Sequence, residues 1–294
     1  MTSPAKENVK DTLGARIKRY EAENEKYLSK NLPIYARLDG RHFSKLTGPM
    51  GYPYLDLPMG KYSRFMWNMM RETAMGLQAE FKADIVETHS DEISLGWKDG
   101  SKIPFEGRYF KLVSNMASYA GALFYKLAAT KHFSKLETLL GDVIRSDAER
   151  IITSPHVPSF DCRLFQVPDL CELTNCFVWR QNDCIRGTIN QYAQRWFSPK
   201  QLHGKSIEDR LKMLRETGHG EYIDSADFKR LKYGSWFKVK TAEYPMPEEF
   251  KKFNQDKKTI IRHVLTEIYV DRLGPMPAQE KIDVLFAEEG YITL

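Results

Sequence analysis

Residues 84–97 have the pattern of a β-hairpin, and this feature restricts the possible folds more than any other in the sequence. An apolar stretch leads to the polar pair Ser90-Asp91, and apolar side chains then alternate with others as far as Trp97. An earlier strand-like run at 34–38 also alternates, and it ends at an Asp-Gly pair. A strand that is followed by a hairpin predicts an antiparallel sheet.

Helical patterns fill much of the remaining chain. Apolar spacing and capping residues predict helices at about 11–28, 57–82, 109–130, 134–152 and from Asp169 to about Phe197. Strands are expected at 160–167 and 235–240, whereas 259–273 fits either helix or strand. The methionines of the 57–82 segment are expected to pack in the core. This order of segments predicts an α+β fold, a polymerase-palm-like antiparallel sheet with flanking helices, which nucleotide cyclases share.

The composition narrows the class of protein and its location. The chain has 294 residues, a formal net charge of +5 and a pI near 8.8, a mild positive balance that is compatible with a polyanionic partner. Its four cysteines form no Cys-x-x-Cys pair, so no structural zinc site is expected. No apolar run reaches membrane length and no apolar signal segment opens the chain, so we expect a cytoplasmic protein without a membrane span.

A carboxylate stands where the first predicted strand ends. Asp39 is followed by Gly40, which lets the backbone approach a ligand closely, and by Arg41, which adds a fixed positive charge. Successive backbone N–H groups after the glycine can bind phosphate oxygens. The alternative is an ordinary Asp-Gly turn at the end of a strand.

Two more acidic residues, Asp91 and Glu92, stand at the bend of the predicted hairpin. If the hairpin pairs with the first strand, Asp91 lies beside Asp39. Such a pair suits magnesium, which prefers hard oxygen ligands and takes only one or two carboxylates beside water and phosphate. Two such ions, about 3.5–4 Å apart, serve phosphoryl-transfer chemistry. The alternative is a solvated polar turn.

Four short blocks carry a resemblance to a known family. They are Arg37-Leu38-Asp39-Gly40-Arg41-His42-Phe43, His89-Ser90-Asp91-Glu92, Phe160-Asp161-Cys162-Arg163 and Trp179-Arg180-Gln181-Asn182-Asp183-Cys184. In order and approximate spacing they resemble the tRNA-His guanylyltransferases and their guanylyltransferase-like 3′-5′ RNA polymerase relatives. The resemblance covers about residues 12–200 and implies a palm-like catalytic domain there. Residues 201–294 would be a C-terminal extension that packs on this domain and is a candidate for tRNA contact.

The resemblance also implies a site. Two Mg²⁺ ions would be held by Asp39, Asp91 and the backbone carbonyl of Gly40, with Glu92 as a supporting catalytic residue. The residues that would bind the nucleotide are Asp39, Gly40, Arg41, His42, Phe43, Ser44, Ser90, Asp91, Arg108 and Lys111.

Four of the basic residues have a second interpretation. Arg108 and Lys111, three residues apart, would face one side of a helix and hold the triphosphate, or they belong to a solvated helix face. Arg163 and Arg180 would contact tRNA, or they form surface ion pairs.

The implied activity is addition of guanylate or other nucleotides to the 5′ end of tRNA, after ATP or GTP activates the 5′ phosphate. Members that add an untemplated G carry His-Ile-Asn-Asn-Leu-Tyr-Asn where this chain has Ile-Arg-Gly-Thr-Ile-Asn-Gln at 185–191, and Gly187 would weaken a helix. The sequence therefore favours template-directed 5′-end repair. Untemplated addition to tRNA-His, a palm-type nucleotide cyclase and an RNA-binding module remain alternatives. The resemblance further implies a homo-oligomer, a dimer or a tetramer.

Overall fold

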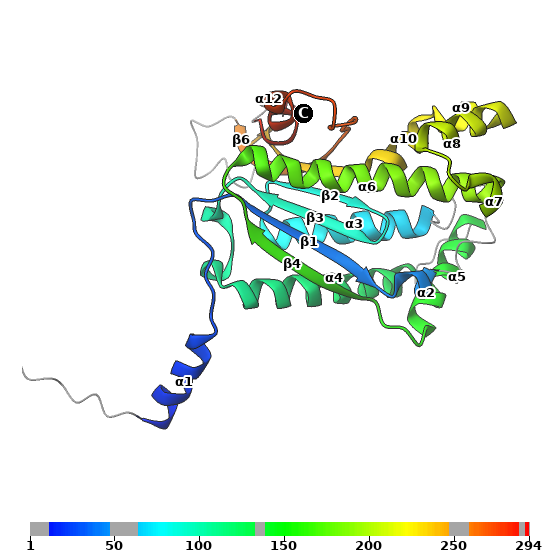
Figure 1. The fold of residues 1–294 in the computed structure, drawn as a ribbon. Helices are drawn as coiled ribbons and strands as arrows, with labels where there is room; N and C mark the ends of the chain where they lie inside the picture. The colour runs from blue at the N-terminus through cyan, green and yellow to red at the C-terminus, as the bar shows by residue number, and fades with distance from the viewer. Residues whose placement is uncertain (1–11, 48–63, 133–138, 247–258, 288–291, 294) are drawn as a thin grey trace, which may run out of the picture.

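The computed structural model describes residues 12–47, 64–132, 139–246, 259–287 and 292–293, and this part of the chain folds around one mainly antiparallel sheet (Figure 1). The strands lie in the order β4-β1-β3-β2-β5-β6, and the short β7 (Ile292–Thr293) pairs in parallel with β5. The strands of the main path are β1 (Ile34–Arg41), β2 (Ile85–His89), β3 (Glu92–Trp97), β4 (Ser159–Gln166), β5 (Ser235–Pro245) and β6 (Thr259–Ile268). The predicted α+β architecture is confirmed.

The predicted hairpin forms β2 and β3. The two strands pair antiparallel as far as His89 and Glu92, and Ser90-Asp91 makes the bend. Ser90 has a φ of 52°, in the left-handed region that a tight bend uses. Since β3 also pairs with β1, the hairpin lies beside the first strand.

Helices α3 (Arg64–Phe81) and α4 (Tyr109–His132) cover one face of the sheet, and α5 (Leu139–Thr153) packs against α4. Met66, Met69 and Met70 of α3 are buried in the largest core cluster, as predicted, whereas Met75 is exposed. Residues 57–63 and 134–138, where two helices were predicted to begin, lie outside the described residues.

Helix α6 (Leu170–Trp196) lies across the opposite face, so helices pack on both sides of the sheet (Figure 1). The side chain of Asp169 caps its start by accepting a hydrogen bond from the backbone N–H of Glu172 at 2.8 Å, as predicted. The helix continues through Gly187, because buried residues such as Ile189 pack against neighbouring elements and hold this segment in place.

The C-terminal third adds short helices and the far half of the sheet. The helices are α7 (Pro199–Leu202), α8 (Ile207–Leu214), α9 (Gly220–Ile223), α10 (Ala226–Tyr233) and α12 (Ala278–Phe286). The segment that fitted helix or strand is strand β6. Residues 201–294 therefore supply β5 and β6 to the same sheet as β1, and one core cluster joins Tyr35 and Phe177 to Trp236 and Phe286.

Helix α1 (Leu13–Glu23) stands away from the rest of the chain, and none of its residues is buried (Figure 1). It is shorter than the predicted 11–28. The short helix α2 (Phe43–Thr47) directly follows β1. Within the described residues, none of the helices has the length and apolar character needed to cross a membrane.

Candidate active site

The ends of β1 and β3 bring the two predicted metal-binding aspartates together. Asp39 is the register partner of Glu92, so it lies one residue from Asp91 across the strand pair. The backbone N–H of Gly40 donates to the carbonyl of Asp91 at 2.8 Å. The approach of two acidic strand ends is thus fixed by backbone hydrogen bonds.

This approach requires glycine at position 40. A Cβ there would lie 2.6 Å from Cδ2 of Phe43 and 2.9 Å from Cβ of Asp91, closer than real Cβ atoms come to other atoms. The ring of Phe43 is itself buried and packs against Phe124 and Phe160, with ring centroids 5.2 and 5.1 Å away. Phe43 therefore offers a nucleotide only its backbone.

The two aspartates form a site that favours a cation. Burial, with the negative charge of Asp39 as a further cause, raises the pKa of Asp91. The hydroxyl of Ser90 donates to Oδ1 of Asp91 at 3.0 Å and partly offsets that shift. A divalent cation would neutralise both carboxylates, and their hard oxygens suit Mg²⁺.

The two aspartates also fit an ion whose ligands come partly from the protein and partly from the substrate. Among the described residues no group of three or more His, Cys, Asp or Glu side chains is arranged to hold a metal. Two carboxylates would leave the remaining coordination positions to backbone oxygen, water and phosphate, as is usual for Mg²⁺.

Glu92 is buried, and each of its two carboxylate oxygens faces an arginine. Its Oε1 accepts from Nε of Arg180 at 2.6 Å, and its Oε2 lies 3.7 Å from Nε of Arg37. Burial raises the pKa of Glu92, and the charges of His89 and Arg180 offset this only in part. The contacts of Glu92 therefore support the site rather than leave it free to bind a metal.

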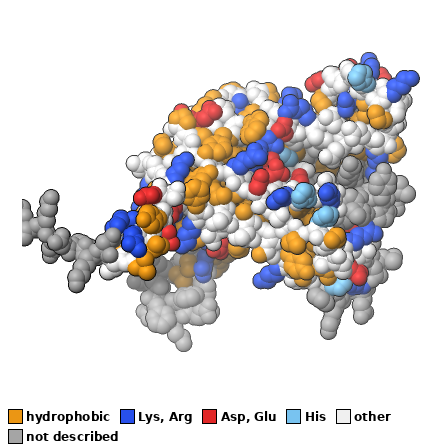
Figure 2. Space-filling model, turned by 60° about the horizontal axis from the view of Figure 1, so that its bottom comes forward, with side chains coloured by type: hydrophobic (Ala, Val, Ile, Leu, Met, Phe, Trp, Pro, Cys, Tyr) orange, Lys and Arg blue, Asp and Glu red, His pale blue; other side chains and the backbone are white. Residues whose placement is uncertain are grey.

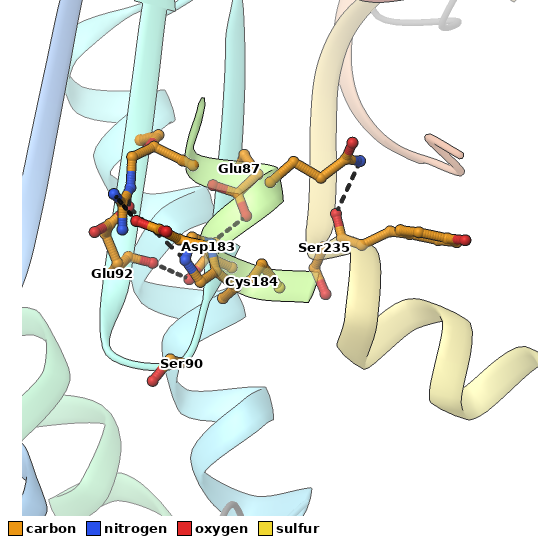
Figure 3. A network of polar contacts seen from close by, with 12 residues as sticks. Glu87, Ser90, Glu92, Asp183, Cys184 and Ser235 are labelled. Carbon is orange, nitrogen blue, oxygen red and sulfur yellow. Dashed lines mark hydrogen bonds and ion pairs between the residues drawn. The ribbon is translucent and has the colours of Figure 1, made fainter. Parts of the chain in front are cut away.

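His89, which was not assigned a catalytic role from the sequence, lies next to Glu92. His89 is 2.7 Å, through Nδ1, from Oε1 of Glu87. Burial alone would lower the pKa of His89, but the charges of Glu87 and Glu92 outweigh it and raise the pKa. Figure 3 shows Glu87 and Glu92 on the hairpin strands facing Asp183 and Cys184 of α6, with Ser90 at the turn.

A pocket of about 290 Å³ opens above these groups. Its wall continues from Asp39 and Asp91 to α6, where Arg180 was a predicted site residue, and to α10, where sequence reasoning identified none. The lining residues from those two helices include Asp183, Thr188, Gln191, Phe228 and Arg230. The Trp-Arg-Gln-x-Asp block indicated part of the α6 wall, but no motif marks α10.

The arginines predicted to contact tRNA have different surroundings. Arg180 is buried, and its Nη1 donates to Asp183 at 2.5 Å in addition to its contact with Glu92. Arg163 is exposed on β4, with Nη2 3.9 Å from Oδ2 of Asp161. Arg163 is therefore available to a ligand, while Arg180 holds the site together.

The remaining predicted nucleotide contacts fall into two groups. Arg41, His42 and Ser44 are exposed just after Asp39, at the pocket end of β1. Arg108 and Lys111 are not brought to this end.

The backbone of Arg108 bridges Tyr27, and Lys111 Nζ lies 4.9 Å from the ring centroid of Phe105. That region contacts the segment that leads into β1, because the N–H of Leu28 donates to the carbonyl of Gly107. Asp39 lies near the other end of β1, roughly 17 Å along the strand from Ile34 at 3.3 Å per residue.

Comparison with known proteins identifies the family. Residues 14–168, more than half of the chain, match the sequence model of the tRNAHis guanylyltransferase (Thg1) family. The chain belongs to the Thg1 family. As a Thg1 family member it is a nucleotidyltransferase of the tRNA guanylyltransferase type, which disfavours both the RNA-binding module and the nucleotide cyclase.

Similar proteins come from a virus, bacteria and yeast. An uncharacterised protein, R259, of Acanthamoeba polyphaga mimivirus is 27% identical over 223 residues, 71% of each chain. A bacterial Thg1-like protein solved in complex with ATP is 26% identical, with a TM-score of 0.58 over 77% of this chain and 88% of that one.

Two further structures share the Thg1 fold. A bacterial Thg1-like protein in complex with GTP is 22% identical, with a TM-score of 0.58 over 93% of this chain and 99% of that one. The Saccharomyces cerevisiae enzyme is 19% identical, with a TM-score of 0.57 over 74% and 90%.

Proposed function

We propose that this enzyme adds nucleotides to the 5′ end of tRNA in the 3′-5′ direction, with Mg²⁺ and with ATP or GTP as activating nucleotide. The observation that carries the proposal is the pair Asp39 and Asp91, held side by side by the Gly40–Asp91 hydrogen bond at the edge of a pocket. Family membership supplies the substrate class.

In this proposal Asp39 and Asp91, with the carbonyl of Gly40, hold two Mg²⁺ ions, which polarise phosphoryl groups and neutralise charge on the leaving group. Arg41 and Ser44 lie where nucleotide phosphates would meet the end of β1. Glu92 keeps the hairpin in place through its buried arginine partners.

The reaction has two transfers. An oxygen of the tRNA 5′ phosphate attacks the α-phosphorus of ATP or GTP, and pyrophosphate leaves. The 3′ hydroxyl of the incoming nucleoside triphosphate then attacks the activated 5′ phosphorus, and the nucleoside monophosphate leaves. The chain needs no covalent nucleophile for either transfer, and its residues bind and orient the reactants.

We favour template-directed repair over untemplated G addition. Residues 185–191 lack the block of members that add an untemplated G, and Gly187 and Thr188 of this segment line the pocket. The bacterial Thg1-like proteins, which resemble this chain, were solved with ATP and with GTP. A homo-oligomeric state, dimer or tetramer, stays a prediction.

Extension of a truncated tRNA tests the proposal. Purified protein is incubated with Mg²⁺, ATP, GTP and a 5′-monophosphorylated tRNA lacking its first nucleotide, with each base in turn opposite the gap. We expect growth by one nucleotide, only when it complements the opposing base. Addition of G to full-length tRNA-His whatever the opposing base would replace repair with the untemplated activity. No extension of either RNA would contradict both.

A further inference from the structure

The outward face of strand β4 is open to solvent. β4 lies at the edge of the sheet, and its side chains alternate, so that Phe160 and Leu164 face the core while Asp161, Arg163 and Phe165 are exposed. An aromatic ring and an arginine on an open sheet face supply the two contacts that unpaired nucleotides use, stacking and phosphate binding.

Trp179 of α6 adds a second and larger ring. Half of it is exposed, 50%, yet its ring centroid lies 4.5 Å from Cζ of Arg180 and 5.3 Å from Cζ of Arg37. Both guanidinium groups are themselves fixed on Glu92, at 2.6 and 3.7 Å. The indole is therefore held in place by cation–π contacts and still presents surface to a ligand.

The position of this ring links it to the active site. Arg37, beneath Trp179, is two residues from Asp39 in β1, so both side chains point to the same face of the sheet, roughly 7 Å apart along the strand. Arg37 is also the register partner of Arg163. Trp179, Arg163 and Phe165 thus lie on the face that carries the catalytic carboxylates.

One positive charge on this surface is accessible to a phosphate. Among the described residues, the ion pair of Arg163 is a long contact to Asp161, 3.9 Å, and both side chains are more than half exposed, so the pair is weak and can open for a phosphate. Figure 2 shows acidic side chains gathered near the middle of one face of the molecule, with Lys and Arg and hydrophobic side chains around them.

We propose that Trp179, with Phe165 and Arg163, forms a stacking platform for the nucleobase at the 5′ end of the RNA acceptor. The base stacks on the exposed indole, and Arg163 binds a phosphate of the same strand. The platform thereby places the 5′ phosphate near Asp39. This inference rests on the proposed function, since it names how that site holds its acceptor.

The test uses Trp179→Ala, the conservative Trp179→Phe, and Trp196→Ala as matched control. Trp196 is a similarly exposed tryptophan, 46%, at the end of the same helix, stacked on His219. We expect the Ala variant to raise the KM for 5′-monophosphorylated tRNA roughly tenfold to a hundredfold, as loss of one stacked base does. Mg²⁺-dependent GTP binding without RNA stays at the wild-type level, Phe recovers most of the loss, and the control changes neither value.

A direct readout places 2-aminopurine at the 5′ end of the tRNA. Stacking quenches its fluorescence, so wild type and Trp179→Phe should quench it and Trp179→Ala should not. Equal quenching by the Ala variant, or loss of GTP binding in that variant, would overturn the platform, the second because Trp179 would then only support the arginines. Wild-type quenching without any tRNA extension would instead refute the proposed function and leave the platform standing.

Discussion

Asp91 is a single residue whose charge should be necessary for catalysis and unfavourable for folding. Burial and then the charge of Asp39 raise its pKa, so the ionised form is less favourable in the folded protein than in the unfolded one. We predict that Asp91→Asn reduces nucleotide transfer to background while the midpoint of thermal unfolding at pH 7.5 stays equal or rises. Single-turnover extension and thermal denaturation measure the two effects.

The control for this variant is Asp227→Asn, an exposed residue on α10, which should change neither value. Near-normal transfer by a folded Asp91→Asn protein would remove Asp91 from the metal site.

Asp147 on α5 is a buried carboxylate that the proposed reaction does not use. It is 1% exposed, neither of its oxygens has a hydrogen-bond partner in the described structure, and Arg150 Nη1 is 3.8 Å away. Burial, opposed by Arg150, raises the pKa of Asp147 to about 6. Because the folded state then binds more protons than the unfolded state between about pH 4 and 6, stability falls as the pH rises through this range.

Asp147→Asn removes the ionisable group and with it the loss of stability between about pH 4 and 6. We predict a gain in unfolding free energy of roughly 1–3 kcal/mol at pH 7.5 and about half of that gain at pH 5, where the carboxyl is largely protonated in the folded state but ionised in the unfolded state. Chemical denaturation at both pH values measures the difference. An equal effect at the two pH values would mean that Asp147 does not titrate in this range.

Among the elements, two glycines should respond in opposite ways to the same substitution. In α6, a Cβ on Gly187 meets nothing within 4 Å, so Gly187→Ala should stabilise the helix by about 0.5–1 kcal/mol. At the end of β1, a Cβ on Gly40 meets Phe43 and Asp91, so Gly40→Ala should destabilise the protein by about 1–3 kcal/mol.

Denaturant titration of both variants measures this contrast, and Mg²⁺-dependent GTP binding reports the site. Binding should weaken in Gly40→Ala, because the substitution displaces Asp91. A Gly40→Ala protein with unchanged stability and binding would show that the strand ends can separate without harm.

Elements with a strong local signal were predictable, and contacts between distant elements were not. The hairpin and α6 follow from alternation and from the Asp169 cap, which are properties of neighbouring residues. Segment 259–273 carries no decisive period, and its strand conformation in β6 depends on pairing with β5. The Arg180–Glu92 contact joins residues 88 positions apart, so no local pattern can reveal it.

The same limit applies to the candidate site. Asp39 and Asp91 could be placed together from one strand and one hairpin, because strand pairing determines their distance. Arg108 and Lys111 were placed by resemblance alone, and the structure has them at the other end of β1. The part of the pocket wall that α10 forms depends on how the last third of the chain packs, and no sequence motif predicts this packing.

For the whole molecule, the sheet joins the C-terminal third of the chain to the part that carries Asp39 and Asp91. β5 pairs with β2 of the β2–β3 hairpin, and the core cluster that includes Ile85 and Phe177 is completed by Trp236 and Phe286. Removing these partners would expose apolar surface and a strand edge at once. The region after residue 200 should therefore be inseparable from the region before it.

A shortened chain that ends at Gly234 tests whether the part of the chain before β5 can fold without the rest. We predict that it lacks a cooperative thermal transition by circular dichroism and binds a hydrophobic dye, while the full chain unfolds in one transition. The matched control is Leu13→Ala with Ile17→Ala in α1, where the side chains are 66% and 46% exposed and should leave the midpoint nearly unchanged. Cooperative unfolding of the shortened chain at the wild-type midpoint would mean that β5 and β6 are dispensable, and that residues up to 234 fold as a unit of their own.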